Sequence, residues 1–212
     1  MNQHYHSTFG AVQESQHIFI ETGLLHIIEN FDAQRSNQAV VLNILEVGFG
    51  TGLNALLTLM EAEKRGIKIH YTTLEAFPLD ENCWRALNYP QLFGSVDYSR
   101  VFAKIHLANW DEPSTISSNF NLHKIHMTLE AYRPSPGLYN LVYFDAFGPD
   151  AQPELWTGDI FNNLFTGMSD GGILVTYSVK GTVVRALRSA GFQTEKLPGP
   201  PGKRHILRAV KM

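Results

Sequence analysis

The segment Leu45–Asn54, L-E-V-G-F-G-T-G-L-N, carries three alternate glycines, Gly48, Gly50 and Gly52. It lies between an apolar run and a helix-like pattern, which predicts a strand-to-helix turn whose bare backbone can approach a ligand. The spacing is G-x-G-x-G, whereas dinucleotide-binding turns read G-x-G-x-x-G. Because the acidic Glu46 precedes the loop, the pattern disfavours a pyrophosphate and favours a ligand that carries an ammonium or sulfonium charge.

A second acidic residue, Glu75, follows a β-branched run about 23 residues after Gly52. This interval is close to the roughly 20 residues at which an acid meets a ribose diol in nucleotide-binding βαβ units. One carboxylate can accept hydrogen bonds from both hydroxyls. Alone, Glu75 could equally be a helix cap or a surface glutamate, but together with the glycine loop it predicts a ribose site.

The segment F-D-A-F-G-P-D (144–150) places Asp145 at the end of an apolar run. An acid there can orient a nucleophilic amine and accept its proton, while Phe147 can stack on a planar substrate. The alternative is that Asp145 caps the next helix, but Pro153 is better suited to open that helix.

A further run is predicted to end in A-N-W (108–110). Asn109 has a donor and an acceptor that can read an adenine edge, and Trp110 can stack on the ring. A helix N-cap and a core aromatic residue explain the same two residues equally well.

The elements that must position these residues alternate along the chain. Strands are predicted near 40–46, 67–75, 101–108, 138–145 and 171–178. Helices are predicted near 53–65, from 78 onward, as a short helix from 111, from 152 to 165 and over 182–191. We further expect two strands across the P-G-P-P-G loop, a hairpin over 17–28 and an additional edge strand over 123–130.

This order predicts an α/β fold with a doubly wound, mostly parallel sheet. Helices should cover both faces, with a C-terminal antiparallel hairpin and an N-terminal β-hairpin extension. The ligand of such a sheet lies beyond the carboxyl ends of its strands. We expect a single domain over residues 1–212, with 1–36 packed on it as the extension.

Composition narrows the class of protein. The chain has 212 residues and one cysteine, Cys83, so an intrachain disulfide and a four-cysteine metal site are excluded. No apolar run approaches the roughly 20 residues of a membrane span, and the N-terminus does not resemble a signal peptide. We therefore expect a soluble, cytoplasmic protein. The histidine pairs His4/His6 and His123/His126 have no suitably placed third ligand, so no metal is expected, and Cys83 is expected to be buried.

The net charge of −3 is unevenly distributed. Residues 171–212 hold eight basic residues and one acidic residue, a charge of +7, so the first 170 residues carry −10. Such a split predicts a surface that faces a polyanion. A chance cluster of solvated side chains is the alternative.

Together these segments resemble the class I (Rossmann-like) S-adenosylmethionine-dependent methyltransferases. They are most similar to the methyltransferase half of the bacterial bifunctional enzymes that complete 5-methylaminomethyl-2-thiouridine at the tRNA wobble position. The resemblance spans most of the chain and rests on E-V-G-F-G-T-G-L-N (46–54), L-E-A-F-P (74–78) and F-D-A-F-G-P-D-A-Q-P-E-L-W-T (144–157), with a similar lead-in at 5–19 and similar closing segments. The aspartate-containing signature is specific, whereas the glycine loop is not.

The resemblance implies S-adenosyl-L-methionine as cofactor and tRNA, at its anticodon stem-loop, as substrate. It implies that Asp145 is the catalytic acid/base or amine-orienting residue. The implied cofactor-binding residues are Glu46, Gly48, Phe49, Gly50, Gly52, Glu75, Ala76, Asn109 and Trp110. The implied substrate-binding residues are Phe147 and Trp156, which could receive the wobble base, and Lys180, Lys203 and Arg204, which could meet phosphates.

The chain departs from this family in two ways. The family commonly has G-D where this chain has Ala108-Asn109. Its bifunctional members also carry an FAD-dependent oxidase domain, for which 212 residues leave no room, so separate enzymes would have to make the aminomethyl-uridine precursor.

Three other functions stay open from the sequence. A polyamine aminopropyltransferase shares the fold and a related sulfonium donor, but usually has a glycine-richer loop and more acidic residues. An NAD-dependent oxidoreductase is disfavoured by the glycine spacing. A non-catalytic protein that only docks on RNA would not need both Glu75 and Asp145.

Overall fold

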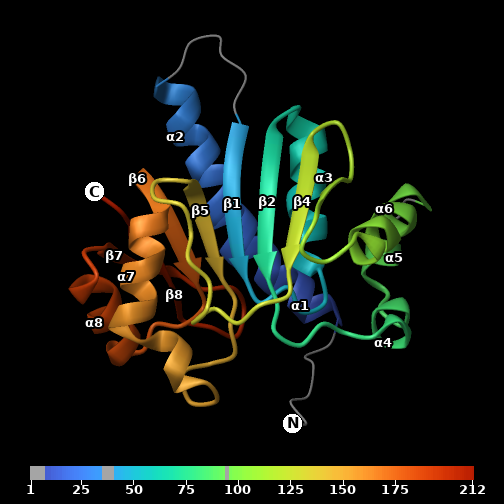
Figure 1. Cartoon of the computed structure of the whole chain (residues 1–212). Coiled ribbons are helices and arrows are strands. Elements are labelled where there is room, and N and C mark those ends of the chain that lie inside the picture. The colour runs from blue at the N-terminus through green and yellow to red at the C-terminus, as the bar shows by residue number, and fades with distance from the viewer. Residues whose placement is uncertain (1–7, 35–40, 94–95) are drawn as a thin grey trace.

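Eight strands form one continuous sheet in the computed structural model, which describes residues 8–34, 41–93 and 96–212 (Figure 1). The strands are β1 (Val41–Val47), β2 (Lys68–Leu74), β3 (Pro113–Thr115), β4 (Phe120–Ile125), β5 (Tyr139–Phe144), β6 (Met168–Thr176), β7 (Gln193–Pro198) and β8 (His205–Val210). Their order is β3-β4-β2-β1-β5-β6-β8-β7. The five central strands from β4 to β6 are parallel, and the two edges are antiparallel. This confirms the doubly wound sheet and its C-terminal hairpin.

Helices cover both faces of this sheet. The α-helices are α1 (Thr8–Ser15), α2 (His26–Gln34), α3 (Leu53–Arg65), α4 (Glu81–Arg85), α5 (Tyr89–Leu92), α6 (Val96–Leu107), α7 (Gly158–Gly167) and α8 (Gly181–Ser189). A π-helical segment, η1 (Gln16–Leu25), joins α1 to α2, and a 3₁₀ turn, η2 (Pro153–Trp156), precedes α7. One hydrophobic core lies under η1, α3 and α6, and the second lies under α7 and α8.

Strand alternation decides which residues face each core. In β1, Leu42 and Ile44 contact the core under α3, whereas Leu45 and Val47 contact the core under α7. Side chains two apart in a strand point to the same face, so Glu46 faces α3. The active-site side chains described below lie on this face.

The predicted N-terminal β-hairpin is wrong, because the described residues 8–34 are helical. The apolar residues Ile20, Leu24 and Ile27 recur at helical spacing and are buried against the sheet. Gly23, in the middle of the expected hairpin, is a packing position. A Cβ there would lie 3.1 Å from Val175 and 3.4 Å from Tyr143, so only glycine lets the helix approach the sheet this closely.

Two predictions between residues 96 and 125 are also wrong. The run 101–108 is not a strand, because it lies in α6 as far as Leu107, and its buried residues Phe102 and Ile105 are three apart and cover one helix face. The helix expected from Asp111 is replaced by the short edge strand β3. The strand expected over 123–130 begins earlier and ends at Ile125, and it is the second strand from the β3 edge. In the part of the chain that the structure describes, no helix is long and apolar enough to span a bilayer.

Candidate active site

The glycine loop joins β1 to α3 at the carboxyl edge of the sheet, and all three of its glycines have positive φ. Its amides are mostly used within the protein. Those of Gly48 and Phe49 donate to the Leu74 carbonyl at 3.0 and 3.2 Å, and that of Gly50 donates to the Glu75 carboxylate at 2.9 Å. A phosphate would need such amides free, so the loop is better suited to a ligand without phosphate.

The glycines differ in what surrounds them. A Cβ on Gly48 would lie 3.0 Å from the Asp145 carbonyl oxygen, and one on Gly52 would lie 2.9 Å from His106 Nε2. By contrast, a Cβ on Gly50 would meet nothing within 4 Å. The loop is therefore packed at both ends and faces open space at its middle, where a ligand could approach the backbone.

Glu75, which follows β2, lies beside this open position. One carboxylate oxygen accepts the Gly50 amide and the other accepts the amide of Phe77, each at 2.9 Å. Every carboxylate oxygen has two lone pairs, so both can still accept a hydroxyl hydrogen. Ala76 is held from the other side, because its carbonyl contacts His126 Nε2 at 3.2 Å.

Asp145 follows β5 and faces α3 through one hydrogen bond. The Asn54 amide donates from Nδ2 to Asp145 Oδ2 at 2.9 Å. Burial raises the pKa of Asp145 to about 7, and the bond from Asn54 offsets part of that rise. A carboxyl with a pKa near neutrality can exchange a proton with a substrate at physiological pH.

Sequence reasoning missed Asn54. It stands in the first turn of α3 and is 4% exposed, among residues that are otherwise apolar. A lone amide in an apolar helix was the available signal, since a buried polar group requires a partner.

Behind Asp145 lies a buried polar cluster built from Glu46, Asn54, Tyr71 and Thr73. Glu46 is fully buried, and among the described residues neither of its oxygens has a hydrogen bond of ordinary geometry. Burial raises its pKa to about 8; the nearby Thr73, Asn54 and Tyr71 side chains lower it, while the Asp145 charge adds to the rise. Glu46 is therefore mainly protonated at neutral pH. It lies inside the protein, which does not fit the expectation that its negative charge meets a cationic ligand.

The family model described as S-adenosyl-L-methionine-dependent methyltransferase matches residues 104–212, just over half of the chain. The chain belongs to this family.

Two curated proteins and one solved structure extend the similarity to nearly the whole chain. The tRNA 5-methylaminomethyl-2-thiouridine biosynthesis bifunctional protein MnmC of Pseudoalteromonas atlantica is 29% identical over 97% of this chain and 30% of its own length. The MnmC protein of Leptospira interrogans is 31% identical over 96% of this chain and 32% of its own length. The crystal structure of MnmC2 from Aquifex aeolicus superposes with a TM-score of 0.72 at 22% identity, over 94% of this chain and 61% of that one. This chain thus spans about a third of the length of the two MnmC proteins. The match to the MnmC2 structure, at 22% identity, shows the fold alone.

The methyltransferase cofactor, S-adenosyl-L-methionine, fits the residues at this edge. It needs a close backbone approach, an acceptor for a ribose diol and no phosphate contacts. The open space at Gly50, the unused acceptor capacity of Glu75 and the engaged loop amides meet these needs.

Asn109 and Trp110, the predicted adenine contacts, do not follow a strand, because the run before them is helix α6. Asn109 follows a helix, and its amide donates to Glu112 at 3.1 Å. Trp110 forms an isolated bridge with Lys124 and packs edge-on against Phe49, with ring centroids 5.9 Å apart. The strand next to β2 is β4, which ends at Ile125. His126 and the residue after it therefore occupy the strand-end position that was expected for Asn109.

Lys124 was also missed. Its side chain is almost fully buried, and its Nζ donates to the His106 carbonyl at 2.6 Å and lies 4.6 Å from the Trp110 ring. Burial lowers the pKa of Lys124 to about 8. This contact ends α6 and supports the aromatic residues behind the glycine loop.

The two aromatic residues expected to receive a base differ in exposure. Phe147 is 54% exposed at the mouth of the site. Trp156 is 5% exposed, donates from its ring nitrogen to the Phe147 carbonyl at 2.8 Å and packs on Phe144. Trp156 is thus a core residue that supports the Phe147 loop, and its ring is not open to a base in this structure.

Two of the three basic residues predicted to contact phosphates form ion pairs within the protein. Lys180 pairs with Asp150, and Lys203 pairs with Glu14 of α1. Arg204 is exposed beside Lys203 in the loop between β7 and β8.

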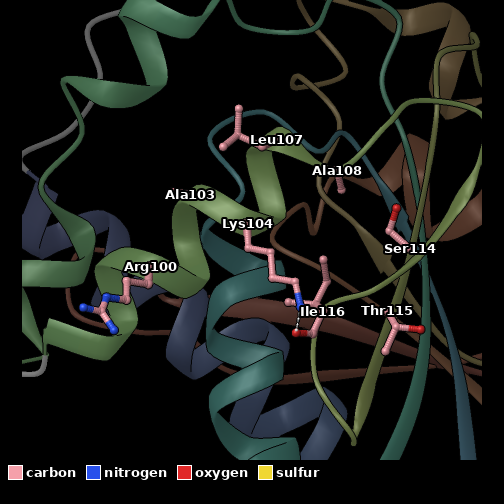
Figure 2. Close-up of a pocket in the computed structure, with 8 residues that line it drawn as sticks. All are labelled: Arg100, Ala103, Lys104, Leu107, Ala108, Ser114, Thr115 and Ile116. Carbon is pink, nitrogen blue, oxygen red and sulfur yellow. Dashed lines mark hydrogen bonds between the residues drawn. The ribbon is translucent and has the colours of Figure 1, made fainter.

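A cavity of about 650 Å³ opens away from these residues, between α6 and the edge strand β3 (Figure 2). Lys104 crosses it and donates to the Ile116 carbonyl at 2.5 Å. None of the predicted site residues line it, so it is distinct from the carboxyl edge.

Among residues 8–34, 41–93 and 96–212, no three His, Cys, Asp or Glu side chains are grouped so that they could hold a metal ion. His4 and His6 lie outside these ranges. Cys83, expected to be buried, is exposed.

Proposed function

We propose that this methyltransferase acts on the wobble uridine of tRNA and converts 5-aminomethyl-2-thiouridine to 5-methylaminomethyl-2-thiouridine. The observation that carries the proposal is Asp145, a carboxyl of near-neutral pKa held by Asn54 at the carboxyl edge of the sheet. An amine is the acceptor that such a group serves best, because it must lose a proton to become a nucleophile. The MnmC relatives, which are named for the biosynthesis of this base in tRNA, suggest the substrate.

Within this proposal the cofactor and the substrate amine are held by different residues. The backbone at Gly48, Gly50 and Gly52 and the side chain of Glu75 hold the cofactor, with Phe49 and Ala76 beside them. When bound, S-adenosyl-L-methionine supplies an electrophilic methyl group on a sulfonium.

Asp145 accepts a hydrogen bond from the substrate ammonium and takes up one of its protons, which leaves a neutral amine with a free lone pair. Asn54 fixes the direction of that carboxylate. Much of the rate acceleration then comes from holding the amine in line.

The tRNA contacts follow from position and charge. A wobble base must leave its stack to reach the site, and the exposed ring of Phe147 offers a stacking surface. Arg204, with Lys180 and Lys203 once released from their partners, is proposed to meet phosphates of the anticodon stem-loop. Separate enzymes would supply the aminomethyl precursor, and the reaction would take place in the cytoplasm.

The direct test is mass analysis of wobble nucleosides. Undermodified tRNA is incubated with the protein and S-adenosyl-L-methionine, and we expect 5-aminomethyl-2-thiouridine to gain one methyl group. Asp145→Ala should keep cofactor binding and lose most of the transfer. A wild-type protein that leaves this nucleoside unchanged would refute the proposal, and a gain of an aminopropyl group from a decarboxylated donor would replace it with the polyamine-type reaction.

A further inference from the structure

Two segments from opposite ends of the chain meet beside Asp145. Glu14 of α1 forms an ion pair with Lys203, in the loop between β7 and β8, and their side chains are 31% and 33% exposed. A second contact joins the same segments, because His17 Nε2 lies 2.9 Å from the Pro198 carbonyl oxygen. The N-terminal helix is therefore held against the C-terminal hairpin even when the ion pair opens.

Contacts with Tyr177 fix the place of this ion pair. Lys203 Nζ lies 4.5 Å from the centre of the Tyr177 ring, and the Tyr177 hydroxyl donates to the Ala146 carbonyl at 2.8 Å. Ala146 is the residue after Asp145, so the pair stands at the same strand end as the proposed catalytic carboxyl.

Charge acts between these groups as well. The negative charge of Glu14 raises the pKa of Asp145 and the positive charge of Lys203 lowers it, after the larger effects of burial and of Asn54. Besides these, the titratable groups that face Asp145 are Tyr71, Tyr177 and the buried Glu46.

We propose that Glu14 is a second carboxylate of the amine-binding site, and that the substrate ammonium replaces the Lys203 ammonium at Glu14. This inference rests on the proposed function. In the free protein Lys203 Nζ stands in for the substrate, because both are primary ammonium groups with three N–H donors. A half-exposed ion pair is weakly held, so such an exchange is feasible.

The exchange has two consequences for specificity. Glu14 and Asp145 together bind a cationic wobble substituent and repel one that ends in a carboxylate. Lys203, once released, remains in a loop of proline and glycine next to Arg204 and becomes available to a phosphate. Entry of the amine and engagement of the tRNA backbone are then coupled.

The test compares the wild type with Glu14→Gln, Lys203→Gln and a control, Glu21→Gln. The control removes an exposed carboxylate from the same N-terminal helical region, where its partner is His17. KM, kcat and the pH dependence of kcat/KM are measured with an anticodon stem-loop that carries 5-aminomethyl-2-thiouridine. The dissociation constant of S-adenosyl-L-methionine is measured by calorimetry.

Glu14→Gln should raise KM about tenfold, with kcat changed less than about threefold and cofactor affinity unchanged within about twofold. The acidic midpoint of the pH profile should fall in Glu14→Gln and rise in Lys203→Gln, because the two charges act on Asp145 in opposite directions. A purely structural role would not produce opposite shifts, and the control should match the wild type.

Equal KM and equal midpoints in the wild type and Glu14→Gln would overturn the inference while leaving the proposed function intact. A wild type that methylates no aminomethyl-uridine would instead remove the proposed function, and this inference with it.

Discussion

Replacing Asn54 by leucine removes the hydrogen bond to Asp145 while nearly preserving side-chain volume. The bond joins Nδ2 to Oδ2 at 2.9 Å and lowers the pKa of Asp145, which burial otherwise raises. A hydrogen bond to a charged group is worth about 1.5–3 kcal/mol, which corresponds to about 1–2 pKa units. The pKa of Asp145 should therefore rise from about 7 to roughly 8–9 in Asn54→Leu.

This shift has a specific kinetic signature. At pH 7 the ionised fraction of Asp145 would fall from about one half to about a tenth or a hundredth, so kcat/KM should fall roughly 5- to 50-fold. The loss should disappear as the pH rises above the new pKa. The assay is kcat/KM for methyl transfer from pH 6 to about pH 10, together with the calorimetric affinity for S-adenosyl-L-methionine, which should be unchanged.

Thr58→Val is the matched control. Thr58 is fully buried one turn further along α3, and its hydroxyl lies 3.3 Å from that of Tyr143. Thr58→Val also removes a buried polar contact, so it should lose as much stability as Asn54→Leu. Its pH profile of kcat/KM should keep the wild-type midpoint. If the profile of Asn54→Leu superimposes on that of the wild type, or if its loss is the same at every pH, the assigned role of Asn54 is refuted.

Three further predictions concern stability, the loop and the tRNA surface. The pKa of Glu46 is raised from 4.5 to about 8, so the folded state is most stable below the unfolded pKa and loses stability as the pH rises toward 8. Glu46→Gln should therefore raise the free energy of unfolding at pH 9 by up to about 5 kcal/mol and leave it nearly unchanged at pH 4. Urea titrations at the two pH values would measure this difference. Gly48→Ala should lower the free energy of unfolding by about 1–3 kcal/mol because of the positive φ at Gly48 and the nearby Asp145 carbonyl. Gly50→Ala should cost less stability but weaken cofactor binding. Equal cofactor affinity in Gly50→Ala and the wild type would exclude the open space at Gly50 as the cofactor site. Arg204→Glu should weaken tRNA binding and flatten its salt dependence; an unchanged slope of log K against log salt would remove Arg204 from the interface.

Strands β1, β2, β5 and β6 and the two acids that follow β2 and β5 were predictable because their signals are local. The glycine loop, Glu75 and Asp145 each follow an apolar run, and parallel strands bring their carboxyl ends together. The helix over 53–65 was predicted with the bounds that the structure has, since Gly52 and Gly66 flank an apolar face of helical period.

The errors arose where a short apolar run fits two periods. In V-F-A-K-I-H-L-A (101–108) apolar residues occur at every second and every third or fourth position. Only packing decides between them. Trp84 and Tyr89 pack on Phe102 in the structure, and no local pattern records those partners. The N-terminal helices were misassigned for the same reason, because the apolar run 17–28 fits a hairpin as well as a helix until it packs against the sheet.

The ionisation states of the site carboxyls could not be predicted from the sequence, for a related reason. Glu46 and Asp145 were visible as acids, but their charge depends on how deeply the fold buries them and on what lies between them. Both face α3, where Asn54 donates to Asp145 and has a carbonyl oxygen without a partner among the described residues. A protonated Glu46 can supply a hydrogen-bond donor for the Asn54 carbonyl oxygen. If Glu46 and Asp145 were both ionised, each would raise the pKa of the other. The pair therefore favours one negative charge, and the more exposed Asp145, where an incoming ammonium can reach it, is the better place for that charge.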